Sequence, residues 1–281
     1  MLVVSIVFWW RPLAGIFGLA LGSPEYTYIL LIPPLGFALI YLERKALPGF
    51  LVPSVGPGAA LLAVALLAAC STEWWKGNIP PDVRLSVSMF SLVIWWIGSI
   101  VFCFGIRAFQ AFLFPVCLLF WIVPIPAPLM DELTYFLQQQ SAFFTRVLFL
   151  VAGVPVTQDG TLLSIPDLDI EVARQCSSIR SSLLLMITTM VFAHLFLCSG
   201  WRKALLIAMA VPLAAMKNGL RIFTIVELGT KVDPAFFEAR LHHQGGILFL
   251  GLSLVAVAAL VWALRRTENP ELRRLRSASV N

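Results

Sequence analysis

A cysteine in a polar stretch is the first residue of this chain that could act as a nucleophile. Cys176 follows Glu171 and precedes Arg180, at the point where a polar segment gives way to an apolar run. The free amide groups and the positive dipole at the start of a helix stabilise a thiolate. Arg180 lies one helical turn further on and would add a cation on the same face. The residues leave two structural alternatives open for Cys176, a buried thiol or a disulfide with Cys70.

Two cations and an amide lie within a second apolar run. Lys217, Asn218 and Arg221 all fall within residues 204–227, and charges inside membrane spans are costly and mark functional sites. At about 1.5 Å per residue, Arg221 lies roughly 25 Å from the start of this run, near the far boundary of a bilayer. Arg221 could therefore snorkel to the lipid head groups. Lys217, one turn deeper on the same face, instead favours a polar cavity or a packed interior.

A pair of histidines comes just before the last apolar run. His242 and His243 are followed by Gln244 and two glycines. They are either solvated loop residues or proton-transfer groups, and the glycines fit both because they permit a tight turn or close packing. With Cys176 and Arg221 they complete the groups that thiol catalysis requires. These are a nucleophile, a proton carrier and a cation that stabilises a thiolate or an oxyanion.

The composition of the chain places these residues in a membrane protein. Of the 281 residues, 59% are hydrophobic and 12% charged, and the mean hydropathy is +0.89. Soluble domains carry about 25% charged residues, so a soluble core, a disordered chain and a small disulfide scaffold are excluded. The net charge of +5 indicates basic cytoplasmic loops rather than a nucleic-acid partner. We predict an all-α polytopic membrane protein with a single domain over residues 1–281, in contact with the lipid bilayer.

Eight apolar runs approach the length that crosses a bilayer, and basic clusters follow the second, fourth, sixth and eighth of them. The positive-inside rule therefore places both termini in the cytoplasm, with residues 265–281 as a cytoplasmic tail. Nothing at the N-terminus resembles a cleavable signal peptide. The five cysteines show no metal-ligand spacing, so we expect neither metal nor cofactor. The predicted spans are residues 3–22, 28–42, 57–71, 84–105, 109–126, 177–198, 204–227 and 245–264.

The connection over residues 127–176 is predicted to lie on the outer face. Within it, residues 130–153 place leucines and phenylalanines at helical spacing among glutamines and serines, which predicts an amphipathic helix in the membrane interface. The pair Asp159-Gly160 is typical of a hairpin turn. We therefore expect a short hairpin that leads directly into the span over residues 177–198.

The segments EVARQCSSIRS, VPLAAMKNGLRI and HHQGGILFLG, in this order, resemble the exosortase/archaeosortase family of membrane cysteine transpeptidases. The early segment YTYILLIPPLGFALIYLERKAL and the loop GVPVTQDGTLLSIPDLDIEVARQC are also similar to that family, so the resemblance covers nearly the whole chain. It implies that Cys176 is the nucleophile and Arg221 the essential arginine. The third member is then His242, which precedes Gly246 by four residues, with His243 as the alternative.

The resemblance also implies a substrate and a location. The substrates would be exported proteins that carry a short C-terminal motif such as Pro-Glu-Pro, a membrane helix and a basic tail. The enzyme would lie in the bacterial cytoplasmic (inner) membrane with its active site at the outer, periplasmic face. It would form a thioester that an unknown amine or water resolves, in connection with surface sorting and exopolysaccharide production. Ser178 stands where the family usually has Gly, which affects substrate preference.

The residues alone allow a second function, which is not enzymatic. Lys217 and Arg221 could bind an anionic solute in a transporter or in a component of polysaccharide assembly. Loss of activity on substitution of Cys176 would separate the thiol enzyme from this alternative. The supporting candidates for the enzyme site are Glu171, Arg180, Lys217 and Asn218.

Overall fold

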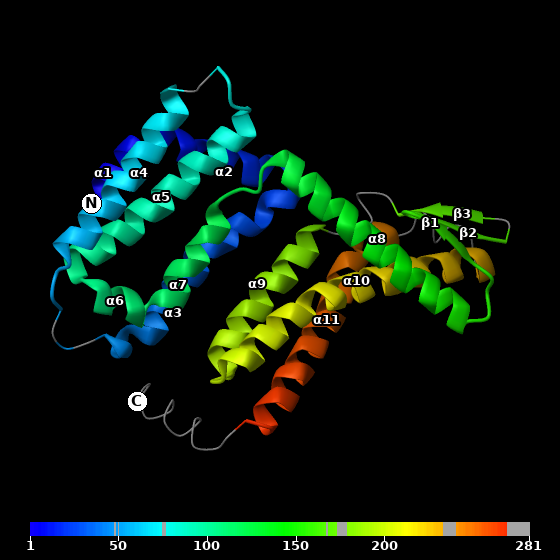
Figure 1. Cartoon of the computed structure of the whole chain (residues 1–281). Helices are drawn as coiled ribbons and strands as arrows, with labels where there is room; N and C mark the ends of the chain where they lie inside the picture. The colour runs from blue at the N-terminus through cyan, green and yellow to red at the C-terminus, as the bar shows by residue number, and fades with distance from the viewer. Residues whose placement is uncertain are drawn as a thin grey trace. The chain divides into compact units, whose positions relative to one another are not determined.

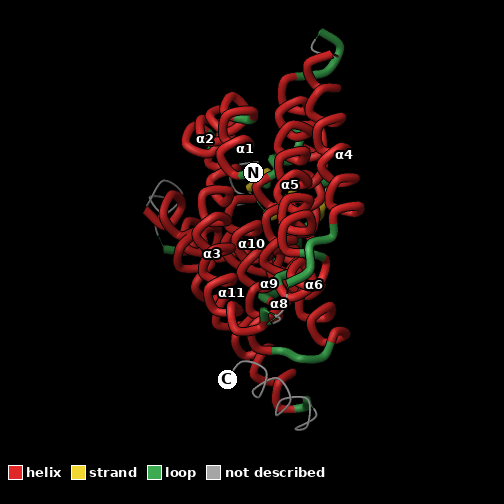
Figure 2. The backbone as a smooth tube through the Cα atoms, turned by 90° about the vertical axis from the view of Figure 1, so that its left-hand side faces the viewer, coloured by secondary structure: helices red, strands yellow, loops and turns green. Residues whose placement is uncertain are grey.

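The computed structural model describes residues 1–268 except 48, 50, 75–76, 167, 173–178 and 233–239, and it gives the backbone alone at 2, 46 and 240–247. This described chain is almost entirely helical, with one small sheet (Figures 1 and 2). The 3₁₀ helices are labelled η. The elements are α1 (Leu2–Phe8), α2 (Trp10–Gly22), η1 (Pro24–Leu31), α3 (Ile32–Glu43), η2 (Arg44–Ala46), α4 (Val55–Trp74), α5 (Pro81–Phe104), α6 (Ile106–Ala111), α7 (Leu113–Leu118), η3 (Leu119–Ile122), α8 (Ala127–Val151), β1 (Thr157–Asp159), β2 (Leu162–Ile165), β3 (Leu168–Glu171), α9 (Ile179–Phe196), α10 (Gly200–Lys231) and α11 (Arg240–Arg266).

Six helical segments of the described residues are long and apolar enough to cross a membrane. A seventh is reached if Leu113–Ile122 and Ala127–Val151, which are bent by 100° relative to each other, count as one span. The all-α polytopic class is therefore confirmed, and six of the eight predicted spans have a counterpart. The fifth, residues 109–126, is divided among α6, α7 and η3 and forms part of a span only if the bent pair is counted as one. The six segments are Pro24–Glu43, α4, α5, α9, α10 and Leu248–Arg266.

The first predicted span, residues 3–22, is not one helix. α1 ends at Phe8 and α2 begins at Trp10, because Pro12 has no N–H for the carbonyl of Phe8 and its ring would clash with that carbonyl in a continuous helix. The pieces of 7 and 13 residues are each too short to cross about 30 Å of hydrocarbon. Trp9, at the break, is buried and donates its Nε1 hydrogen to Ser91 Oγ of α5 over 2.9 Å, so the break is anchored to that helix.

The described chain divides into two compact units, one over Met1–Met130 and one that begins at Asp131. In the first unit α4 and α5 lie side by side (Figures 1 and 2). A Cβ atom on Gly58 would lie 2.5 Å from Phe102 Cα, and one on Gly98 would lie 3.1 Å from Leu61 Cβ. Small residues of this kind let membrane helices approach closely.

The second unit contains α9, α10 and α11, which pack on a shared apolar core. Two alanines and five larger aliphatic side chains make up this core. Its buried members are Leu185, Ala193, Leu197, Leu206, Ala214, Val257 and Val261.

The second unit also contains three short antiparallel strands in the order β1-β2-β3. Asp159 pairs with Leu162, and Gly160 in the turn between them has φ +58°, so the predicted hairpin turn is confirmed. The third strand was not predicted. β3 pairs with β2, ends at Glu171 and is followed by the buried Val172, so the sheet holds the chain just before the segment that contains Cys176.

Candidate functional site

The residues proposed for the site differ in how much of them the structure describes. Cys176 lies in residues 173–178, outside the described residues, and His242 and His243 lie in α11 with only their backbone described. Glu171 ends β3 and Arg180 is the second residue of α9, both with exposed side chains. The geometry of the site is therefore given by the remaining candidates, on α10.

Lys217 and Arg221 are buried side chains of one membrane helix. Their exposed fractions are 6% and 7%, and they lie four residues apart and hence on the same face of α10. The Lys217 ammonium donates a hydrogen bond to Ser181 Oγ of α9. Burial at this level disfavours an arginine that snorkels to the lipid head groups, and it supports the packed interior that the pair of cations predicts.

Asn218 is fully buried, with an exposed fraction of 0%. Neither its amide nitrogen nor its amide oxygen has a hydrogen-bond partner among the residues that the structure describes. A buried amide is normally paired, and leaving it unpaired costs about 1–3 kcal/mol. This cost at the centre of the candidate site is consistent with a group that is kept for a ligand.

A stripe of polar residues on α8 contacts the elements that carry the site, and it was not predicted from the sequence. All four side chains are buried, whereas the neighbouring aromatic residues Tyr135, Phe136 and Phe143 are exposed. Polar side chains of a membrane helix face protein rather than lipid, so their spacing could have shown this stripe. It consists of Thr134, Gln138, Ser141 and Thr145.

The stripe connects α8 both to α10 and to the strand before Cys176. Gln138 Nε2 donates to the carbonyl of Val172 over 2.6 Å, and Thr145 Oγ1 donates to the carbonyl of Gly219 over 3.3 Å. A Cβ atom on Gly219 would lie 2.9 Å from Phe144 Cβ, so only glycine allows this approach without displacement. The contacts fix the stretch of α10 that carries Lys217 and Arg221.

A cavity of about 380 Å³ opens between α8, α10 and α11 beside this stretch. Its wall is apolar apart from Lys217 and Ser253, and the Ser253 hydroxyl donates to the carbonyl of Leu250 over 2.7 Å. Lys217 is the one charged residue among the described residues that line the cavity, and its ammonium donates to Ser181 of α9, which does not line it. The apolar part of the wall consists of Phe144, Val147, Leu148, Leu213, Met216, Leu220, Phe249, Leu252 and Ala256.

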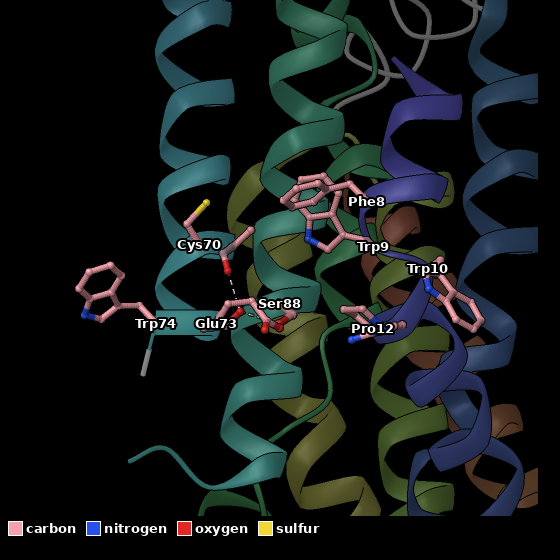
Figure 3. Close-up of a pocket in the computed structure, with 11 residues that line it drawn as sticks. Phe8, Trp9, Trp10, Pro12, Cys70, Glu73, Trp74 and Ser88 are labelled. Carbon is pink, nitrogen blue, oxygen red and sulfur yellow. Dashed lines mark hydrogen bonds between the residues drawn. The ribbon is translucent and has the colours of Figure 1, made fainter. Parts of the chain in front are cut away.

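The first unit holds a larger groove, of about 580 Å³, where α1 and α2 face α4 and α5 (Figure 3). Phe8, Trp9, Trp10 and Trp74 line it, and Thr72 and Ser88 share a 3.3 Å hydrogen bond at its wall. No residue predicted for the site lies in this groove.

Cys70 also lines the groove and is an exposed, free thiol. Cys176, the partner proposed for it in a disulfide, lies outside the described residues. Among the described residues, no group of three or more His, Cys, Asp and Glu side chains is placed to hold a metal ion.

A family comparison identifies the type of site that these residues belong to. The model of the transmembrane exosortase family matches residues 9–259 of the 281. The chain belongs to the exosortase family. No curated protein and no solved structure matches it. Exosortases are cysteine-type membrane proteases and transpeptidases that act on exported proteins. Membership of this family gives the chain the general role of a membrane transpeptidase, and its apolar helices make it a multi-pass membrane protein.

Proposed function

We propose that this exosortase cleaves the C-terminal sorting signal of exported proteins through a thioester on Cys176. The observation that carries the proposal is the family match over residues 9–259, a range that includes Cys176, Arg221 and His242. The buried polar stretch of α10 supports it, because a cation inside a dry interior is worth far more to a developing negative charge than one in water.

In the proposed reaction, the Cys176 thiolate attacks the carbonyl carbon of the scissile peptide bond. The carbonyl oxygen becomes an oxyanion, which the Arg221 guanidinium stabilises. When the C–N bond breaks, His242 gives its proton to the leaving amine, and the acyl group remains on sulfur as a thioester. An amine or water then attacks the thioester carbon and gives a proton to His242, the C–S bond breaks, and the sulfur leaves as a thiolate.

The structure on both sides of Cys176 suits a nucleophile at the start of a helix. β3 ends at Glu171, Gln138 holds the carbonyl of Val172, and α9 begins at Ile179. A thiolate close to the N-terminus of α9 is stabilised by the helix dipole and by unpaired N–H groups. Arg180, exposed in the first turn of α9, adds positive charge there.

We further propose that the site faces the periplasm and that the chain lies in the bacterial cytoplasmic membrane. Basic clusters after alternate spans support this orientation. A substrate helix held in the bilayer would present a motif such as Pro-Glu-Pro at the outer interface, with its basic tail in the cytoplasm. The cleaved proteins would be sorted to the cell surface in connection with exopolysaccharide production.

A reporter that carries such a signal tests the proposal. Cys176→Ala and Cys176→Ser should abolish cleavage, whereas Cys198→Ala should leave it unchanged, because Cys198 lies at the opposite end of α9. Full cleavage by both Cys176 variants would exclude thiol chemistry at Cys176, and no cleavage by the unaltered protein would favour a transporter that binds an anionic solute at Lys217 and Arg221.

Mass spectrometry of the product terminus separates transfer from hydrolysis. A terminus that carries an added amine-bearing group establishes a transpeptidase and gives the mass of the acceptor. A free carboxylate on every product molecule would show that water resolves the thioester.

A further inference from the structure

A hollow of about 450 Å³ opens between α8 and the turn of the β-hairpin, within the second unit. Most of its wall is polar, whereas most small-molecule pockets have apolar walls. Arg146 is the one charged residue among the described residues that line it. The other lining residues are Gln139, Gln140, Phe143, Gln158 and Gly160.

The hollow lies next to the residues that hold the chain before Cys176. The N–H of Val172 donates over 3.0 Å to the carbonyl of Thr161, which directly follows Gly160, and Gln138 Nε2 donates to the carbonyl of Val172 over 2.6 Å. The hairpin turn and α8, which form the walls of the hollow, therefore both hold Val172. Cys176 follows Val172 by four residues, and four residues of chain span at most about 14 Å. A peptide that occupies the hollow thus needs only a few further residues to reach the nucleophile.

The side chains of the hollow have the chemistry that binds an acidic peptide segment. The guanidinium of Arg146 presents its donors in a planar fork, which fits a carboxylate with two parallel hydrogen bonds. Each glutamine amide both donates and accepts, as a peptide group does. Gln158 Nε2 donates to the carbonyl of Gly160 over 3.0 Å, which fixes that amide at the wall. A lipid phosphate has acceptor oxygens alone, so it would leave the amide oxygens of the glutamines without a donor.

We propose that this hollow is a substrate subsite, in which Arg146 binds the carboxylate of an acidic residue of the sorting segment and the glutamines bind the peptide groups beside it. The inference rests on the proposed function, in which a motif such as Pro-Glu-Pro meets the enzyme at the outer interface. α8 and the hairpin belong to the connection over residues 127–176, which is predicted to lie on that face. Arg146 thus determines specificity for an acidic residue, whereas Arg221 acts at the scissile bond.

A double-mutant cycle with the purified enzyme in phosphatidylcholine vesicles tests this subsite. Arg146→Gln in the enzyme and Glu→Gln in the Pro-Glu-Pro motif of the reporter should each lower kcat/KM about tenfold to a hundredfold, mainly through KM. The two changes together should cost no more than either alone. Arg146→Glu should regain cleavage of a reporter that has Arg in place of that Glu. Arg11→Gln removes an exposed arginine of α2, outside the hollow, and should cleave every reporter as the unaltered enzyme does.

The contrary results separate this subsite from the proposed function. Arg146 is exposed, so its variants should fold as the unaltered enzyme does. Effects of the two changes that multiply, or normal cleavage by Arg146→Gln, would overturn the subsite alone if cleavage still depends on Cys176. An Arg146→Gln defect that is the same for every reporter and appears only in vesicles with anionic lipid would assign Arg146 to a lipid phosphate and also overturn the subsite. Cleavage by Cys176→Ala, or none by the unaltered enzyme, would instead overturn the proposed function.

Discussion

The start and the middle of α10 treat buried charge in opposite ways. Near the start of the helix, Arg202 lies 3.8 Å from Glu268 Oε1, and the side chain of Glu268 is 0% exposed. The same carboxylate oxygen accepts the backbone N–H groups of Cys198 and Ser199 over 2.9 and 2.7 Å, and Arg202 Nη2 donates to the carbonyl of Thr267 over 2.6 Å. Charge there connects the end of α11 to the start of α10.

Further along the same helix the protein supplies much less. Among the residues that the structure describes, Lys217 has one hydroxyl partner and Asn218 has none, although both are as deeply buried as the side chains of the first cluster. Arg202 Nε and Glu268 Oε2 also have no hydrogen-bond partner among the described residues, so the difference lies in the ion pair, which Arg202 has and Lys217 has not among the described residues. The difference separates a structural cluster from a functional one.

The largest effect that we expect is at the proton carrier. General acid–base catalysis contributes about 10²- to 10⁴-fold in rate, so His242→Ala should lose most of its cleavage activity. His243→Ala should lose little, because adjacent residues of a helix point about 100° apart. Reporter cleavage normalised to protein amount measures both. An inactive His243→Ala beside an active His242→Ala would shift the assignment by one residue.

Substitution of Arg221 tests whether the site on α10 depends on the geometry of the guanidinium as well as on its charge. Loss of an oxyanion donor costs about 10²- to 10³-fold in kcat, and we expect this for Arg221→Ala. Arg221→Lys should be nearly as poor, since an ammonium cannot reproduce the two parallel hydrogen bonds of a guanidinium. Near-normal turnover by the Lys variant would show that charge alone is sufficient.

Substitution of Glu268 should affect stability rather than chemistry. Glu268→Gln leaves Arg202 without its counter-ion and should lower the free energy of unfolding by about 3 kcal/mol. The rate of cleavage per folded molecule should not change. Denaturant unfolding in detergent micelles, run beside the reporter assay, measures both quantities. A loss of turnover at unchanged stability would remove the distinction between a structural cluster at Arg202 and a functional one around Lys217.

The converse result is expected for Asn218, with the smallest effects. Asn218→Leu removes an amide that has no partner, so the free energy of unfolding should stay the same or rise by about 1 kcal/mol. Cleavage should fall about tenfold if the amide binds a peptide group of the substrate. A variant that is destabilised but normally active would make Asn218 a structural residue.

The sequence predicted those parts of the fold that depend on local pattern. The span over residues 84–105 is α5, Pro81–Phe104, because an apolar run in a bilayer can only be a helix or a barrel strand. The turn at Asp159-Gly160 was also predicted, because an Asp-Gly pair is typical of hairpin turns that need a positive φ. Gly160 has such a φ in the structure. The break at Trp9 was missed, although Pro12 is visible in the sequence, because hydropathy does not register a missing N–H.

The sequence predicted less of the site, because its remaining contacts come from distant parts of the chain. The spacing of Lys217 and Arg221 alone placed both cations on one face of a helix. The hydroxyl of Ser181 on Lys217 and the amide of Gln138 on Val172 join separate helices and strands. The helix that carries the polar stripe was predicted to lie in the membrane interface, because its leucines and phenylalanines recur at helical spacing, whereas in the structure the stripe is buried against protein.

Thiol labelling from one side of the membrane tests most directly whether Cys176 is a nucleophile that faces outward. In a variant with Cys70, Cys103, Cys117 and Cys198 replaced by Ala, a membrane-impermeant maleimide added to intact spheroplasts should label Cys176 and abolish reporter cleavage in parallel. A bound substrate should slow the labelling. Labelling only after the membrane is permeabilised, or full labelling with cleavage retained, would contradict a thiol enzyme whose site faces outward.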